Sequence, residues 1–143
     1  MEILFIDDNP GEAFVFKQAI ANISPSIRVT NMPYCMDLLW VLKAQKPDFL
    51  FLSLDPEKKD GLFYLRMVKS LKELGSMPVI MYANSINDQQ ITTCYKAKAN
   101  YFLVKPCTFA NTISSLSQII SPILQHKHKT IKDQFVINNV VAV

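Results

Sequence analysis

Residues 49–61, FLFLSLDPEKKDG, contain a strand followed by a turn, and this combination decides the fold. The segment opens with four consecutive apolar residues, a pattern typical of a strand that is covered on both faces. It then passes through Ser53 and Asp55 into a charged loop that closes at Gly61. Strands covered on both faces belong to parallel sheets, because each parallel pair needs a crossover helix. The segment therefore predicts one strand of a parallel α/β sheet.

Short apolar runs of the same kind recur along the chain and alternate with longer amphipathic segments. The predicted strands are residues 3–6, 27–30, 49–54, 79–82 and 101–104. The predicted helices extend from Asn9 through Ile23, then over about 36–44, 62–74 and 88–98, and the last begins after Thr108. This βα alternation, repeated five times, predicts one domain with a doubly wound five-stranded parallel sheet.

Several of the predicted helix ends carry local signals. Asn9 can cap the first helix, Pro10 suits its first turn, and Glu12 has the spacing of a capping box. Gly75 is placed to end the third helix, and Pro122 disturbs the last turn of the fifth. These signals fix the predicted helices more firmly than periodicity alone.

Composition and charge argue against several classes of protein. No run reaches the roughly 18 apolar residues of a membrane span, and no basic segment precedes the first apolar stretch, so we expect a cytoplasmic protein without a membrane partner. The net charge of +3 is modest and predicts no nucleic-acid partner. Cys35, Cys94 and Cys107 lack paired metal-ligand spacing, and we expect reduced thiols.

Polar residues follow the predicted strands where function gathers in such sheets, at their carboxyl ends. The first strand ends in Asp7 and Asp8, the third in Ser53 and Asp55, and the fifth in Lys105. Clustered carboxylates suit a hard Mg²⁺ ion, and a lysine can neutralise the charge of a phosphoryl group. These strand ends form the candidate site.

Four segments together resemble the receiver domain of two-component response regulators, the CheY-like family. They are the acidic pair after the first strand, PDFLFLSLDPEKKDG, PVIMYANS and NYFLVKP, in that order along the chain. The resemblance covers residues 1–124 and leaves 125–143 as a C-terminal tail of unknown role. It implies a flavodoxin-like (βα)5 fold with strand order 2-1-3-4-5.

The resemblance also implies roles for individual residues. Asp7 and Asp8 match the acidic pair that holds Mg²⁺, and Lys105 matches the family's lysine. Phe102 matches its aromatic switch position. Ser53, however, stands where the family places its phosphoacceptor aspartate, and Ala83 stands where a threonine or serine binds the phosphoryl group. The resemblance therefore implies an atypical receiver, unable to take a phosphoryl group at the usual site.

Each of these residues has an alternative interpretation. Asp55 lies two residues beyond Ser53, and three interpretations of it stay open: a third metal ligand, a displaced acceptor or a solvated loop carboxylate. The acidic pair also suits the amino terminus of a helix. Lys105 can form a buried ion pair with Asp7 or Asp8, and an aromatic residue such as Phe102 in a strand is often part of the core. We expect a weak Mg²⁺ site at Asp7, Asp8 and Asp55, and no other cofactor.

The predicted function is that of a single-domain response regulator in a phosphorelay. It acts by binding signalling proteins such as a histidine kinase or a downstream target, and it is not an enzyme. The alternative is a small metal-dependent enzyme for phosphoryl transfer or hydrolysis that uses Asp7, Asp8 and Asp55. The tail is an added edge strand, a partner-exchange arm or a packed segment, and a homodimer is left open.

Overall fold

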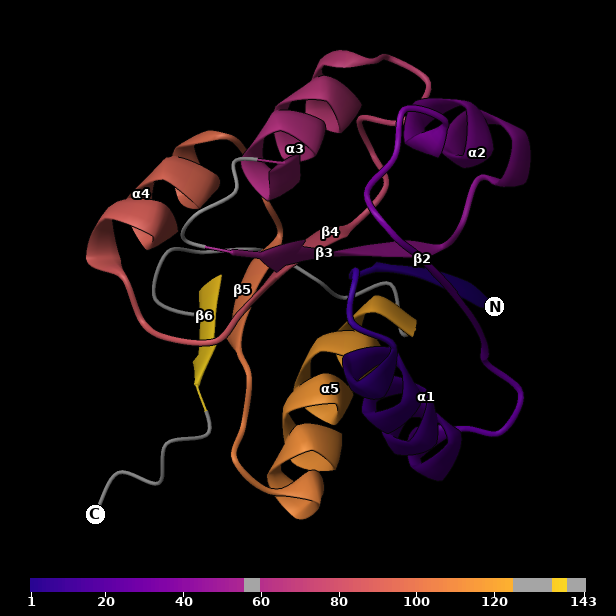
Figure 1. Ribbon diagram of the computed structural model, residues 1–143, viewed down its shortest axis with the longest axis vertical. Coiled ribbons are helices and arrows are strands. Elements are labelled where there is room, and N and C mark those ends of the chain that lie inside the picture. The colour runs from indigo at the N-terminus through magenta and orange to yellow at the C-terminus, as the bar shows by residue number, and fades with distance from the viewer. Residues whose placement is uncertain (56–59, 125–134, 139–143) are drawn as a thin grey trace.

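The structure, a computed structural model, describes residues 1–55, 60–124 and 135–138 of the chain. A parallel sheet lies between two layers of helices (Figure 1). The strands are β1 (Glu2–Ile6), β2 (Arg28–Met32), β3 (Phe49–Leu54), β4 (Val79–Ala83), β5 (Tyr101–Val104) and β6 (Val136–Asn138). The helices are α1 (Pro10–Ile23), α2 (Leu38–Gln45), α3 (Asp60–Ser70), α4 (Asp88–Lys96) and α5 (Phe109–Leu124).

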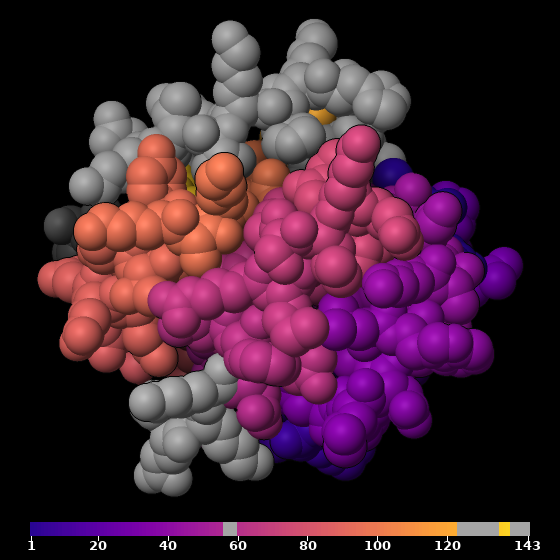
Figure 2. Space-filling model, turned by 90° about the horizontal axis from the view of Figure 1, so that it is seen from above, coloured from indigo at the N-terminus to yellow at the C-terminus, as the bar shows by residue number. Residues whose placement is uncertain are grey.

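The strand order confirms the predicted topology and extends it by one strand. The sheet runs β2-β1-β3-β4-β5-β6, and every pair is parallel. Helices α1 and α5 cover one face of the sheet, and α2, α3 and α4 cover the other (Figure 1). Figure 2 shows this second layer from outside, with α3 between α2 and α4. The arrangement places the carboxyl ends of β1 and β3 side by side.

Side chains of successive strand residues pack alternately into two apolar cores, one on each face of the sheet. Phe5 points toward α1, where its ring stacks on Phe16 with centroids 4.2 Å apart, while Leu4 packs into the opposite core. Strands β3 and β4 are buried almost throughout, as predicted. The edge strand β2 differs, because only one neighbour covers it, and Arg28 and Thr30 are exposed.

The end of α3 departs from the prediction. The helix covers Asp60–Ser70 rather than 62–74, so Gly75 does not end it. The Ser70 hydroxyl donates to the Met67 carbonyl at 2.8 Å, and tighter i to i−3 turns follow. These turns bury Leu74 and Met77 in the core. Tertiary burial therefore decides this boundary, and a local stop signal does not.

The remaining helix predictions have mixed outcomes. The Asn9 side chain caps α1 by accepting from the backbone N–H groups of Gly11 and Glu12, at 2.8 and 3.3 Å. The prediction of a capping box is wrong. The Asn9 N–H donates to Asp7 Oδ1 at 2.9 Å, and the Glu12 carboxylate faces Lys105 instead. Helix α5 continues past Pro122 to Leu124.

The described part of the tail is an added edge strand. Val136, Ile137 and Asn138 pair with Phe102, Leu103 and Val104 of β5 in parallel register. Residues 125–134 and 139–143, with the two histidines, lie outside the described residues. No helix in the described ranges is long and apolar enough to cross a membrane.

Candidate functional site

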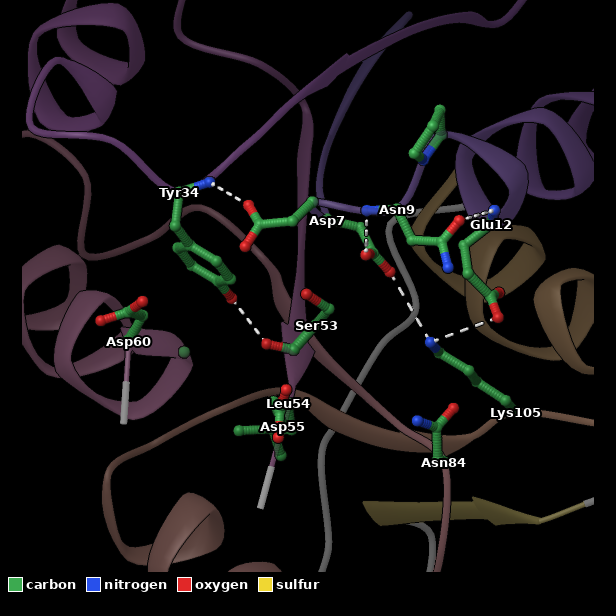
Figure 3. A pocket seen from close by; sticks show the side chains of 13 residues that line it. Asp7, Asn9, Glu12, Tyr34, Ser53, Leu54, Asp55, Asp60, Asn84 and Lys105 are labelled. Atoms are coloured by element: carbon green, nitrogen blue, oxygen red, sulfur yellow. Dashed lines mark hydrogen bonds and ion pairs between the residues drawn. The ribbon is translucent and has the colours of Figure 1, made fainter. Parts of the chain in front are cut away.

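The predicted site residues meet around one pocket at the carboxyl ends of β1, β3 and β4 (Figure 3). The pocket has a volume of about 530 Å³. Five of its thirteen lining residues are acidic, and one is a lysine. The lining residues are Asp7, Asp8, Asn9, Pro10, Glu12, Tyr34, Ser53, Leu54, Asp55, Asp60, Gly61, Asn84 and Lys105. The sequence analysis placed Asp7, Asp8, Ser53, Asp55 and Lys105 together, and the structure agrees.

A buried ion pair joins β1 to the segment after β5. Lys105 Nζ lies 3.6 Å from Asp7 Oδ2, and the two side chains are only 13% and 10% exposed. The same ammonium lies 3.7 Å from Glu12 Oε1 and 5.0 Å from the centre of the Tyr82 ring. Figure 3 shows Lys105 reaching toward both carboxylates. The ion pair expected between Lys105 and the acidic pair is thus present, to Asp7.

The two oxygens of Asp7 have different environments. Oδ1 accepts the Asn9 N–H, which holds the carboxylate at the start of α1. Oδ2 is buried and accepts no hydrogen bond from the residues that the structure describes. The Lys105 ammonium is therefore the group that compensates the negative charge on this oxygen. Burial raises the pKa of the neighbouring Tyr82 phenol, and the nearby Glu12 and Asp7 carboxylates raise it further. Tyr82 therefore stays neutral beside the ion pair.

Tyr34, which the sequence analysis did not identify, closes the other side of the pocket. Its backbone N–H donates to Asp8 Oδ1 at 3.0 Å, and its hydroxyl donates to the Ser53 carbonyl at 2.7 Å (Figure 3). Its ring stacks on Tyr64 with centroids 5.7 Å apart. Burial is the main cause that raises the pKa of the Tyr34 phenol, so the hydroxyl remains a donor. Tyr34 thereby ties the segment after β2 to the end of β3.

Gly61 allows α3 to approach the end of β3. A Cβ atom at this position would lie 2.8 Å from the Ser53 carbonyl oxygen and 3.0 Å from Leu54 Cδ2. The sequence analysis assigned Gly61 to a turn, yet it is the second residue of α3 and its φ is not positive. Close packing, and not a left-handed conformation, explains the glycine.

The positions implied by the family resemblance fall into two groups. Ser53 lines the pocket, whereas Ala83 is buried at the end of β4 and contributes only a methyl group and a carbonyl that accepts the Lys105 N–H at 2.7 Å. Phe102 lies outside the pocket, fully buried in the core beneath α4. The core interpretation of Phe102 is therefore correct, and its role as a switch stays a prediction.

The expected metal ligands share the pocket without forming a compact cluster. Asp7, Asp8 and Asp55 all line it, but Figure 3 shows Asp55 beyond Ser53 and away from Asp7. Within the described ranges, no three acidic, histidine or cysteine side chains lie close enough together to hold a metal ion. Carboxylate oxygens facing a pocket are suitable donors for a hard cation, so the residue types fit Mg²⁺ better than their spacing does.

Comparison with known proteins gives consistent matches. A family model described as the response regulator receiver domain matches residues 3–117. The probable methanogenesis regulatory protein FilR2 of Methanothrix harundinacea (strain 6Ac) is 24% identical over 123 residues, which cover 82% of this chain and 79% of that protein.

Solved structures share the fold. A response regulator from Hahella chejuensis superposes with a TM-score of 0.77 at 16% identity, covering 90% of this chain and 98% of that chain. The Mn²⁺-bound form of response regulator Rcp1 superposes with a TM-score of 0.65 at 19% identity, covering 91% and 98%.

Proposed function

We propose a function that proceeds from one premise: this chain belongs to the family of response regulator receiver domains of two-component signalling. Within that family, we propose that it is an atypical receiver that takes no phosphoryl group at the usual position. One observation carries this proposal. Strand β3 contributes Ser53 and Leu54 to the pocket, and Ser53, whose carbonyl accepts the Tyr34 hydroxyl, has a hydroxyl where the family's chemistry needs a carboxylate.

The surroundings of Ser53 give little help to a serine nucleophile. A hydroxyl needs a neighbouring base to attack phosphorus. The Asp7 and Glu12 carboxylates are already paired with Lys105, the lysine that lines the pocket. Ala83 supplies no hydroxyl to hold the incoming phosphoryl oxygens. Asp55 is the other candidate acceptor, and it is exposed and lies beyond Ser53 (Figure 3).

The proposed activity is protein binding. The Asp7–Lys105 ion pair neutralises one of the carboxylates that line the pocket. We propose that the chain signals through contacts with other proteins, such as a histidine kinase or a downstream target, and that it is not an enzyme. The described residues also include no group of three acidic, histidine or cysteine side chains that could hold a metal ion, which does not favour metal-dependent phosphoryl transfer or hydrolysis.

A weak Mg²⁺ site is part of the proposal. Asp7 and Asp8 would hold the ion, with Asp55 as the third candidate ligand. A bound Mg²⁺ would neutralise carboxylate charge in the pocket. Lys105 competes for this role, because its ammonium already neutralises the buried oxygen of Asp7. We therefore expect low affinity.

Phosphorylation with a small donor tests the proposal. The protein is incubated with acetyl phosphate and Mg²⁺ and then examined by intact-mass spectrometry and peptide mapping. We expect no stoichiometric adduct. An adduct on Ser53 would overturn the proposal, and an adduct on Asp55 would identify a displaced acceptor.

Metal binding is tested by Mn²⁺ relaxation and calorimetry on the wild type and two variants. Asp8→Ala should abolish the weak binding. The matched control Asp88→Ala removes a carboxylate from the first turn of α4, outside the pocket, and should leave binding unchanged. Equal binding by the wild type and Asp8→Ala would place the metal elsewhere.

A further inference from the structure

The outer side of β5 is covered by a segment from the end of the chain. Strand β6 follows α5 after residues 125–134 and pairs with β5 through only three residues (Figure 1). Val136 packs against the core beneath α4, while Ile137 packs against the core on the α5 side. Both faces of this short strand are therefore used.

Next to this edge the Phe135 ring packs against Tyr95 and Phe102, and we call the space that it fills the aromatic cleft. The Phe135 side chain is 1% exposed. Its ring lies edge-on to Tyr95 of α4, with centroids 5.2 Å apart, and 6.4 Å from the ring of Phe102 in β5. A buried aromatic anchor beside an open strand edge is the arrangement by which many sheets bind extended peptides.

We propose that the outer edge of β5 and the cleft between Tyr95 and Phe102 form a strand-docking site, of which β6 is the built-in and displaceable occupant. The external occupant is an extended segment of a partner protein that runs parallel to β5. It carries an aromatic residue followed by two aliphatic residues, the chemistry of Phe135, Val136 and Ile137. This inference deepens the proposed function, on which its biological meaning rests, by naming the kind of partner.

The short ladder is the reason to expect displacement. Strand β5 has only four residues, and three of them pair with the described residues of β6, so this ladder contains few hydrogen bonds. Phe135 is fully buried, whereas Val136 and Ile137 are partly buried. Phe135 is therefore the main anchor, and a segment with the same anchor can compete for the cleft.

Docking at this site is coupled to Phe102. The Phe102 ring is fully buried, and Phe135 is one of the groups that cover it. When β6 leaves, the Phe102 side of the cleft is exposed until another segment covers it. Occupancy of the docking site therefore contributes to the burial of Phe102.

A peptide of residues 133–143, DQFVINNVVAV, serves as the probe. In the full-length Phe135→Ala variant the internal occupant loses its anchor, which should raise the open population about a hundredfold. The labelled peptide should therefore bind this variant at least about tenfold more tightly than the wild type, whose own strand competes at high effective concentration. Fluorescence anisotropy measures both affinities.

Matched controls separate docking from nonspecific adhesion. A peptide with Phe135→Ala should not bind either chain. The Phe14→Ala chain loses a phenyl group that is 64% exposed on α1, in the opposite helix layer, and should bind the probe as weakly as the wild type. The Ile137→Asp chain weakens β6 but keeps the aromatic cleft intact. It should bind the probe more tightly than the wild type even if Phe135→Ala fails to fold.

Three results would overturn the proposal. The first is a folded Phe135→Ala or Ile137→Asp chain that binds no probe, and the second is equal binding of the probe and the control peptide. The third is a wild-type chain whose mass doubles in light scattering through exchanged tails, because the occupant would then be a second copy. Binding is measured without a phosphodonor, so none of these results bears on whether Ser53 accepts a phosphoryl group.

Discussion

Replacing Lys105 by methionine removes the ammonium that neutralises Asp7 while keeping most of the side-chain volume. In the wild type, Lys105 Nζ lies 3.6 Å from Asp7 Oδ2, and this oxygen is buried and accepts no hydrogen bond from the described residues. At an effective dielectric constant of about 20, the Coulomb attraction over this distance is about 4–5 kcal/mol. The lysine no longer needs to be desolvated, which offsets part of this loss, so we expect a net destabilisation of about 2–3 kcal/mol.

The expected loss appears as a lower melting temperature. For a chain of this size, about 2–3 kcal/mol corresponds to roughly 6–10 °C. Circular dichroism and urea unfolding measure both quantities. Millimolar Mg²⁺ should recover part of the loss, since a cation near Asp7 can replace the missing charge by mass action.

Two comparisons isolate the ion pair. The double variant Asp7→Asn with Lys105→Met leaves no unpaired buried charge and should be more stable than Lys105→Met alone. The matched variant Glu12→Gln breaks the outer contact of Lys105, at 3.7 Å to a carboxylate that is 36% exposed, and should cost less than about 1 kcal/mol. Two results would refute the reasoning. One is a Lys105→Met chain with the same melting temperature as the wild type, and the other is a double variant that is less stable than Lys105→Met.

Three further predictions concern residues around the site and in the core. Gly61→Ala should destabilise the protein by about 1–3 kcal/mol in urea unfolding, because its Cβ would lie 2.8 Å from the Ser53 carbonyl oxygen; a stabilised variant, as helix propensity alone predicts, would contradict this. Burial lowers the pKa of Lys69 from 10.5 to about 8, so between about pH 8 and 10 the unfolded chain retains a proton that the folded chain has lost. The free energy of unfolding should therefore rise with pH over this range in the wild type. An equal rise in Lys69→Met would show that Lys69 is not the group that titrates. Burial raises the pKa of the Cys94 thiol to about 11 while Cys107 is exposed, so iodoacetamide at neutral pH should label Cys107 and leave Cys94 unreacted until the protein unfolds; similar labelling rates for both would show that Cys94 is accessible.

The parts of the fold that local chemistry controls could be predicted from the sequence. Uninterrupted apolar runs identified β1, β3, β4 and β5, because strands covered on both faces leave that pattern. The Asn9 cap could also be predicted, since its hydrogen bonds reach only two and three residues along the chain. The shared pocket of Asp7, Ser53 and Lys105 followed from the rule that parallel strands end at the same edge.

The parts that depend on contacts distant in sequence could not be predicted. Tyr34 matters because its hydroxyl meets the Ser53 carbonyl 19 residues away, and no local pattern marks such a partner. The capping box at Glu12 failed because Asp7 satisfies the Asn9 N–H and Lys105 attracts the Glu12 carboxylate. The edge strand in the tail was one of three alternatives, because the largely apolar segment FVINNVVAV fits each of them.

Side-by-side phosphorylation of three chains tests the central claim most directly. The wild type, Ala83→Thr and the double variant Ser53→Asp with Ala83→Thr are each treated with acetyl phosphate and Mg²⁺, and phosphate on each residue is measured by mass spectrometry. The account predicts that only the double variant is phosphorylated, on the introduced aspartate, because Asp7, Asp8 and Lys105 already line the pocket. Phosphate on Ser53 of the wild type would contradict the claim. So would a double variant that folds and binds Mg²⁺ but remains unmodified, because Ser53 would then not occupy the acceptor position.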